Sequence, residues 1–254
     1  MVDELGYLVG HCLLVETDSS GLVLVDTGIG LADLADPNRR LGRSFNSAFR
    51  PQLDPARTAI RQIEQLGFAA GDVRHIVVTH LDVDHAGGLP DFPDAIVHVH
   101  ADEKDAAMAR RWPKESGRYR PNHWAHGPRW SLYSATDGEP WFGFAAVRTL
   151  AGLPDEILAI PLAGHSRGHA AIAVRTPSTW LLHAGDAYFH HSMVVTPPGR
   201  MPFGLRAFER LVAIEPTRLG ANHARLRELA SSHAGEVAVF SAHDPAEFLA
   251  LKGG

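Results

Sequence analysis

Short apolar runs recur along the chain and predict β-strands. The first two, "HCLLVET" and "LVLVDTG", are separated by "DSSG" and predict a hairpin that ends in a tight turn at residues 26–28. Seven further runs have the same character, and we interpret each of them as a strand: "HIVVT", "AIVHVH", "AAVRTL", "ILAIPLAG", "AAIAVRT", "TWLLHAG" and "EVAVF".

Between and after these runs, apolar residues at intervals of three and four predict helices. Residues 56–66 have this spacing, and Gly67 supplies a stop signal directly after them. We expect further helices over residues 102–111, 203–214 and 222–233. This alternation of strands and helices is typical of an α/β protein whose sheets are covered by helices.

Composition limits the protein class without naming a function. With 254 residues, 45% hydrophobic and 21% charged, the chain has the length and character of one globular domain over residues 1–254. Its net charge of −5 gives no general support for nucleic-acid binding, and we expect none. Cys12 is the single cysteine and "MVDELGY" has no signal-peptide pattern, so we expect a cytoplasmic protein without membrane association.

Histidine and aspartate residues gather where the predicted strands end. The stretch "THLDVDHAGG", residues 79–88, places two histidines and two aspartates within six positions. Other candidate ligands follow later strands, and the full set is His80, Asp82, Asp84, His85, His165, His169, Asp186 and His243. Loops at one edge of a sheet can converge, and nitrogen and oxygen donors suit a divalent metal.

These motifs, with "VDTG" at 25–28, resemble the metallo-β-lactamase fold superfamily in order, spacing and strand-end position. The resemblance implies an α/β fold arranged as an αββα four-layer sandwich, with a metal site at one edge of its two sheets. It covers nearly all of the chain except about residues 105–140, which we interpret as a lid-like insertion. The "HAGG" turn and an aspartate at the bridging position are most similar to the lactonase branch.

The resemblance also implies two divalent metal ions, with zinc first and manganese or iron as alternatives. One ion would receive His80, Asp82 and His165, the other Asp84, His85 and His243, and Asp186 would bridge them together with a hydroxide.

Four residues receive supporting roles. Asp26 is expected to organise the loop near the site, and His169 to orient the His165 loop or to touch substrate. Asp84 would also orient the hydroxide or pass a proton to the leaving group. Tyr188 is a candidate for polarising a carbonyl group, at a different offset from the bridging aspartate than in the lactonases.

Asp82 departs from the superfamily pattern, in which a histidine usually stands at this position. With Asp82 as a third carboxylate, two divalent ions and a hydroxide give a formal charge of zero, where a histidine would leave +1. An anionic donor lowers the Lewis acidity of its metal, and two histidines with one carboxylate are associated with iron(II). Two alternatives stay open, in which Asp82 accepts a hydrogen bond near the metal or serves only the turn.

The segment between residues 110 and 140 combines basic and aromatic residues without a clear period. Its members include Arg110, Arg111, Lys114, Arg118, Arg120, Arg129, Trp112, Tyr119, Trp124 and Trp130. Three interpretations stay open: an electropositive, aromatic-lined lid for an anionic or amphipathic substrate, a homodimer contact, and a solvated excursion without a partner.

The reaction that we expect is hydrolysis of a small acyl compound, a lactone or an ester, by attack of the bridging hydroxide on a carbonyl. A thioester hydrolase of the glyoxalase II type is one alternative, although only eleven residues follow His243, too few for the helical domain those enzymes use. An iron-dependent oxidoreductase on the same fold is another alternative. A binding protein with a degenerate site is a third.

Overall fold

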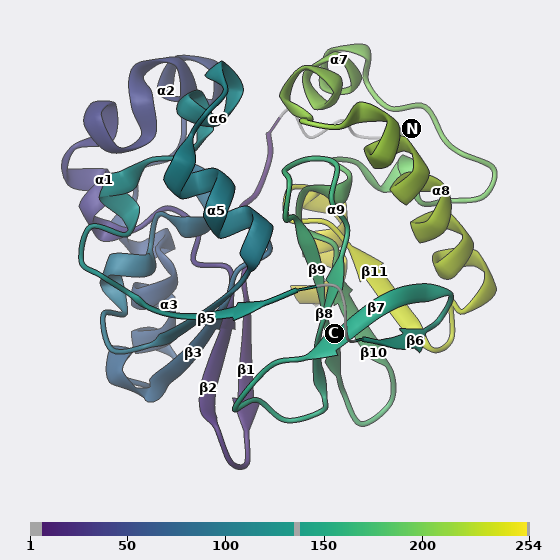
Figure 1. The fold of residues 1–254 in the computed structure, drawn as a ribbon, viewed down its shortest axis with the longest axis horizontal. Coiled ribbons are helices and arrows are strands. Elements are labelled where there is room, and N and C mark those ends of the chain that lie inside the picture. Colours follow the sequence, from purple (N-terminus) through teal and green to yellow (C-terminus); the bar gives the residue numbers. More distant parts are fainter. Residues whose placement is uncertain (1–6, 135–137, 253–254) are drawn as a thin grey trace. The chain divides into compact units, whose positions relative to one another are not determined.

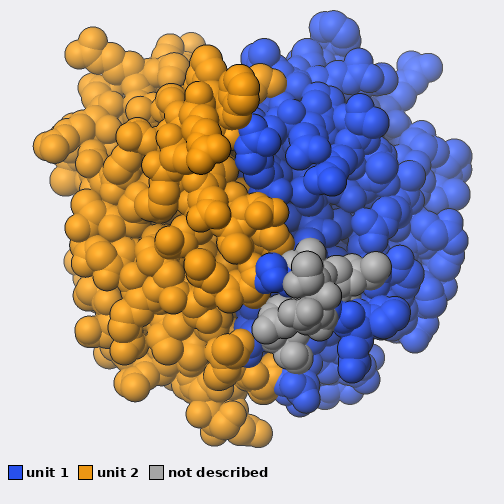
Figure 2. Space-filling model, in the orientation of Figure 1, with its two compact units in different colours: residues 1–11, 134–150, 155–254 blue, residues 12–133, 151–154 orange. Residues whose placement is uncertain are grey.

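A computed structural model describes residues 7–134 and 138–252 of the chain. The chain divides into two compact units, coloured separately in Figure 2. Unit 1 consists of residues 1–11, 134–150 and 155–254, and unit 2 of residues 12–133 and 151–154. Each unit contains one β-sheet and its own hydrophobic core. The prediction of a single domain stays a prediction.

Unit 2 is built on a five-stranded sheet with the strand order β1-β2-β3-β4-β5. Figure 1 labels β1, β2, β3 and β5 of this sheet. Its strands are β1 (Leu13–Thr17), β2 (Gly21–Val25), β3 (Val73–Val77), β4 (Ile96–His100) and β5 (Arg129–Tyr133). β1 and β2 pair antiparallel, which confirms the predicted hairpin, and the pairs from β2 to β5 are parallel. The carboxyl ends of parallel strands lie at one edge, so the segments that follow β2 and β3 start from the same edge.

Six α-helices connect the strands of unit 2. They are α1 (Leu31–Ala35), α2 (Arg43–Phe49), α3 (Ala59–Gln65), α4 (Val83–Ala86), α5 (Ala101–Ala109) and α6 (Pro113–Arg118). A π-helical turn, Asn38–Gly42, and four 3-10 turns, Pro55–Arg57, Ala70–Asp72, Leu89–Asp91 and Pro121–His123, lie between them. α3 buries Ile60 and Ile63, whereas Leu66, directly after the helix, is 66% exposed.

The segment from residue 110 to residue 133 belongs to the body of unit 2. Tyr119 and Trp124 lie in the hydrophobic core, and Tyr119 is fully buried. Arg129–Tyr133 forms β5, which pairs with all five residues of β4. The interpretation of this stretch as a solvated excursion is therefore wrong for the part of the segment that the structure describes in unit 2. The lid and the homodimer contact stay predictions.

Unit 1 contains a six-stranded sheet with the order β11-β10-β9-β8-β7-β6 (Figure 1). Its strands are β6 (Glu139–Trp141), β7 (Phe144–Thr149), β8 (Ile157–Pro161), β9 (Ala170–Arg175), β10 (Trp180–His183) and β11 (Val237–Phe240). β10 and β11 are parallel, and the other neighbours are antiparallel. β8, β10 and β11 therefore run in the same direction and end at the same edge.

The described part of unit 1 contains α7 (Phe203–Val212) and α8 (Pro216–Ser232), which lie between β10 and β11, and α9 (Pro245–Lys252), which follows β11. Two 3-10 turns, Gly185–Ala187 and His191–Met193, precede them. α8 begins six residues before the predicted start because Pro216 occupies its first turn, where a missing backbone N–H costs nothing. Its Leu226 and Leu229 pack in the core of unit 1. Among the described residues, no helix is both long and apolar enough to cross a membrane.

Candidate metal centre

The "VDTG" and "HAGG" turns of unit 2 are joined by backbone contacts. The Thr27 backbone N–H and hydroxyl both donate to the carbonyl of His85, at 2.8 and 2.7 Å. The Gly88 N–H donates to the carbonyl of Gly28 at 3.0 Å. A Cβ on Gly88 would lie 2.7 Å from the Thr27 carbonyl oxygen, so only glycine permits this approach. The two motifs therefore form one local structure at the carboxyl ends of β2 and β3.

Asp26 orients the two histidines that follow β3. Its carboxylate accepts hydrogen bonds from the Thr79 N–H, the Thr79 hydroxyl and His85 Nδ1, each at 2.8 Å. Because the Thr79 hydroxyl donates to Asp26, its oxygen accepts from Nδ1 of His80 at 2.9 Å. Both imidazoles thus carry their proton on Nδ1 and present Nε2 as the metal-ligating atom, the arrangement in which carboxylates usually hold metal-binding histidines. Asp26 has a φ of +54°, a strained conformation of the kind that clusters at functional sites.

The Asp82 side chain lies between a histidine and an arginine. Asp82 Oδ2 is 3.5 Å from His80 Nε2, and Oδ1 is 3.0 Å from Arg118 Nε. Asp82 occupies the N-cap position of α4, but its side chain makes no capping hydrogen bond there. The structure therefore gives no support to a role in the turn alone. Asp84 lies in the first turn of α4, directly before His85.

In unit 1, three strand ends bring a carboxylate between two imidazoles. His165, Asp186 and His243 follow β8, β10 and β11, respectively, and all three side chains are buried. Asp186 Oδ2 is 3.4 Å from His165 Nε2, and Asp186 Oδ1 is 3.0 Å from His243 Nε2. Each carboxylate oxygen thus faces a different histidine.

Contacts within unit 1 fix the rings and backbone of this group. His243 Nδ1 donates to the carbonyl of Val9 at 2.7 Å, and the Phe189 ring stacks on the His243 imidazole with an interplanar angle of 5°. The Asp186 N–H donates to His169 Nε2 at 3.0 Å. His169 therefore holds the backbone of Asp186, and its expected roles at the His165 loop or at the substrate stay predictions.

The loop of His165 is held against the connection between α7 and α8. The Ile214 N–H donates to the His165 carbonyl at 3.0 Å, and the Glu215 N–H to the Gly164 carbonyl at 2.8 Å. Gly164 has a φ of +154°, and a Cβ there would lie 2.7 Å from the Leu219 backbone nitrogen. Glycine is therefore required immediately before this histidine.

Both donor groups fit a divalent transition metal. Two ligands about 2.0–2.2 Å from one tetrahedral metal lie about 3.4 Å apart. The separations of 3.5 Å between His80 and Asp82 and 3.4 Å between His165 and Asp186 agree with this value, and that of 3.0 Å between His243 and Asp186 is somewhat shorter. All three pairs join an imidazole nitrogen with a carboxylate oxygen, a donor combination that zinc, iron and manganese sites use.

The structure does not bring Tyr188 to the ligands of unit 1. Its ring is fully buried in the core, and its hydroxyl donates to Glu247 at 2.8 Å. The Ser241 N–H donates to the second oxygen of Glu247 at 2.8 Å. Burial raises the pKa of Glu247 to about 7, in spite of these hydrogen bonds. We therefore omit Tyr188 from the proposed catalytic residues.

Two residues near the donor groups were not identified from the sequence. Thr79 carries no metal-ligand chemistry of its own, and the preference of a hydroxyl for a neighbouring carboxylate gives no sequence signal. Arg118 lies 36 positions after Asp82, in a segment without periodicity. The sequence shows only that Arg118 is a basic residue in a stretch that also contains aromatic residues.

A third group of potential ligands, His190, His191 and Asp244, lies within unit 1. Asp244 Oδ2 accepts from the N–H and Nδ1 of His191, at 2.6 and 2.7 Å. Its other oxygen accepts from the backbone N–H groups of Ala246 and Glu247 at the start of α9. Asp244 is therefore explained as the residue that caps α9 and anchors the loop of His191.

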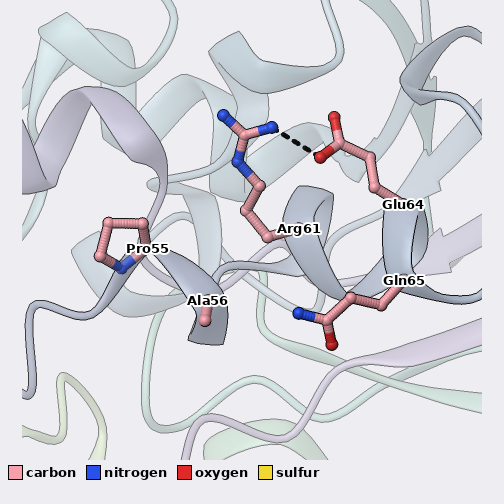
Figure 3. Close-up of a pocket in the computed structure, with 5 residues that line it drawn as sticks. All are labelled: Pro55, Ala56, Arg61, Glu64 and Gln65. Atoms are coloured by element: carbon pink, nitrogen blue, oxygen red, sulfur yellow. Dashed lines mark hydrogen bonds and ion pairs between the residues drawn. The ribbon is translucent and has the colours of Figure 1, made fainter.

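A surface hollow of unit 2 offers no comparable donors. It is lined by Pro55, Ala56, Arg61, Glu64 and Gln65, and its charged residues form an ion pair in which Arg61 Nη1 lies 2.6 Å from Glu64 (Figure 3). These side chains include one carboxylate and neither histidine nor cysteine.

The sequence model of the metallo-β-lactamase superfamily matches residues 5–223. The chain belongs to this superfamily. A probable metallo-hydrolase of Mycobacterium tuberculosis is 46% identical over 238 residues, which cover 94% of this chain and 75% of that protein. The N-acyl homoserine lactonase AttM of Rhizobium radiobacter is 27% identical over 165 residues, covering 64% of this chain and 59% of the relative.

Solved structures of two lactone-hydrolysing enzymes share the fold. An N-acyl homoserine lactone hydrolase with N-hexanoyl-L-homoserine bound at its catalytic metal centre matches with a TM-score of 0.71 and 21% identity, covering 96% of this chain and 84% of that one. The dizinc lactonase AidC matches with a TM-score of 0.60 and 16% identity, covering 94% and 73%. The predicted superfamily, the metallo-hydrolase class and the α/β fold of metallo-β-lactamase type are confirmed.

Proposed function

We propose that the chain is a binuclear metal-dependent hydrolase that acts on a small acyl substrate, a lactone or an ester. The observation that carries this proposal is the position of Asp186. Its two carboxylate oxygens face Nε2 of His165 and Nε2 of His243. A carboxylate placed in this way can donate one oxygen to each of two metal ions, which is the bridging role expected from the sequence.

The proposed ligands follow the order of the superfamily's motifs. One metal would be held by His80, Asp82 and His165, the other by Asp84, His85 and His243, and both would share Asp186. The contacts within each unit support their own part of this set, because each of His80, His85 and His243 has its Nδ1 hydrogen-bonded, which makes Nε2 the nitrogen that would ligate. Zinc is the metal we expect first, with manganese or iron as alternatives.

When bound, two divalent metals supply Lewis acidity and lower the pKa of water toward neutrality. The chain's own residues would fix geometry and move protons. Asp26 and Thr79 hold His80 and His85 at one tautomer, and His169 holds the backbone of Asp186. Asp84, in the first turn of α4 directly before His85, is the carboxylate we propose for passing a proton to the leaving group.

The names of two relatives support the substrate class. AttM and the hydrolase matched in structure both act on N-acyl homoserine lactones by name, and the M. tuberculosis relative is a probable metallo-hydrolase. A lactone and an ester present the same carbonyl and the same kind of alkoxide leaving group. We therefore propose this pair of substrates ahead of a thioester.

The test combines metal analysis with a substrate panel. Purified protein would be stripped of metal, reconstituted with zinc, manganese or iron(II), and assayed with an N-acyl homoserine lactone, an aryl ester and an acyl thioester. We expect two metals per chain and hydrolysis of the lactone or the ester ahead of the thioester. Two bound metals without any hydrolysis would contradict the proposal. Bound iron with oxygen consumption in place of hydrolysis would favour the redox alternative.

A further inference from the structure

Asp82 of unit 2 has an arginine partner from a distant part of the same unit. Arg118 Nε lies 3.0 Å from Asp82 Oδ1, and the two side chains are only 9% and 14% exposed. The other carboxylate oxygen, Oδ2, faces His80 Nε2 at 3.5 Å. The two oxygens of Asp82 are thus directed to different neighbours, one cationic and one a metal-ligand candidate.

A buried glutamate links the two chain segments that carry Asp82 and Arg118. Glu103 of α5 is fully buried, and its Oε1 accepts both the Leu81 N–H and the Tyr119 hydroxyl, each at 3.0 Å. Leu81 directly precedes Asp82, and Tyr119 directly follows Arg118. One carboxylate oxygen therefore ties the two chain segments together beside the Asp82–Arg118 pair.

The burial of this pair distinguishes it from an ordinary surface ion pair. Exposed pairs contribute about 0–1 kcal/mol, because water screens both charges. An arginine side chain that is only 9% exposed loses most of the hydration of its charge and requires a partner that compensates for the loss. The planar guanidinium also holds a carboxylate in a defined orientation, which a flexible ammonium group does less well.

We propose that Arg118 is a positioning residue that makes Asp82 a one-oxygen metal ligand and offsets its charge; this inference rests on the proposed binuclear metal site. Arg118 occupies Oδ1 and leaves Oδ2 toward the metal that His80 binds. Its positive charge balances the negative charge that the aspartate adds, so the site keeps the net charge that an imidazole at position 82 would give. The pair Asp82–Arg118 thus replaces a histidine with an oxygen donor at equal charge.

The test measures metal affinity and requires no assay of activity. Zinc would be titrated into metal-free protein against a chromophoric chelator, giving the dissociation constants of the two binding steps. We expect Arg118→Met to weaken one step by about 10–100-fold, the usual effect of losing a residue that holds a metal ligand. Arg118→Lys should weaken it less. Arg111→Met is the matched control, because Arg111 is exposed in the same segment, and both constants should stay unchanged.

A second background separates positioning from general structure. In Asp82→His protein no carboxylate remains for Arg118 to hold, so Arg118→Met should no longer weaken zinc binding. An equal loss in both backgrounds would overturn the inference, as would unchanged zinc constants in the Arg118→Met protein. Should Arg118→Met fail to fold by circular dichroism, Arg118→Lys in the two backgrounds provides the same comparison. If the wild-type protein binds two zinc ions and Arg118→Met binds them with the same constants, this inference alone is overturned. If the wild-type protein binds no zinc, the proposed function is overturned as well.

Discussion

The carboxylate of Asp26 lies 2.8 Å from Nδ1 of His85 and fixes which nitrogen of that imidazole can bind a metal. The same carboxylate accepts the Thr79 N–H and hydroxyl. Because a carboxylate only accepts hydrogen bonds, His85 Nδ1 must be the donor in this contact. A histidine with its proton on Nδ1 has its lone pair on Nε2. Asp26, in the tight turn after β2, therefore determines the tautomer of His85.

Asp26→Asn should disturb this arrangement without changing the size of the side chain. If the amide oxygen keeps the Thr79 N–H, the amide NH2 group faces His85 and forces its proton onto Nε2. We expect zinc affinity to fall by about 10–100-fold at one of the two binding steps. Chelator competition measures this loss. Asp18→Asn, in the exposed turn between β1 and β2, is the control, and an equal loss in both variants would contradict the tautomer argument.

Asp186→Asn should change the number of bound metals. An amide is a weak ligand with one oxygen, so it cannot hold two cations as a carboxylate does. We expect metal content, measured by mass spectrometry after dialysis, to fall from two ions per chain toward one, with a large loss of hydrolysis. Asp155→Asn is the control because this residue is exposed in unit 1. Two retained metals in Asp186→Asn would show that Asp186 does not bridge.

Tyr188→Phe tests the one catalytic candidate that the structure places elsewhere. The substitution removes the hydroxyl that donates to Glu247 and leaves a buried carboxylate with one fewer donor. We expect the free energy of unfolding to fall by about 1–3 kcal/mol in urea, the cost of a lost buried hydrogen bond. The ratio kcat/KM should change by less than about threefold. A loss of about 100-fold in kcat at unchanged stability would instead restore Tyr188 to the active site.

His98 should make unit 2 sensitive to acid. Its Nε2 lies 2.9 Å from His75 Nδ1 in the sheet, and burial lowers the pKa of His98 from 6.5 to about 4. Below pH 6.5 the unfolded chain binds a proton at His98 that the folded chain does not. The contribution of neutral His98 to the free energy of unfolding is therefore fully present above pH 6.5 and is lost as the pH falls toward 4. This amounts to about 3 kcal/mol at most.

The corresponding measurement compares urea unfolding at pH 7.5 and pH 4.5 in EDTA, so that metal release does not contribute. His98→Gln removes the titrating group, and its stability should fall by about 2 kcal/mol less between these pH values than that of the wild type. His233→Gln, at a partly exposed position in unit 1, should keep the full pH dependence. Equal pH dependence in all three proteins would show that His98 is not responsible.

Local pattern was enough to predict most of the sheet strands, because most of them are short apolar runs bounded by turn residues. The hairpin β1–β2 and strands such as β10 and β11 agree with their predicted runs. β5 was not predicted, since Arg129–Tyr133 mixes charged and aromatic residues, and its place in the sheet depends on pairing with β4. Leu66 has the helical spacing but stays exposed, because tertiary packing, and not periodicity alone, decides which residues are buried.

The candidate ligands could be predicted for a different reason. Histidines and aspartates directly after apolar strands carry a chemical signal that does not depend on packing. The residues that orient them carry no such signal. Thr79 and Arg118 act through contacts that exist only after folding, across 53 positions in the pair Asp26–Thr79 and 36 in the pair Asp82–Arg118. The ligand types are thus visible in the sequence, whereas their tautomers and charge balance are not.

Gly164→Ala should reduce metal binding through the backbone alone. A methyl group at this position would approach the Leu219 nitrogen to 2.7 Å, at a φ of +154° that residues other than glycine rarely adopt. The loop would have to move away from α8, and His165 would move with it. We expect zinc affinity to fall at least about 10-fold and the protein to lose about 1–3 kcal/mol of stability. Gly220→Ala is the control: this glycine is inside α8 with open space at its Cβ. It should gain up to about 1 kcal/mol and keep its zinc affinity. Unchanged zinc binding in Gly164→Ala would mean that the position of His165 does not depend on its contact with α8.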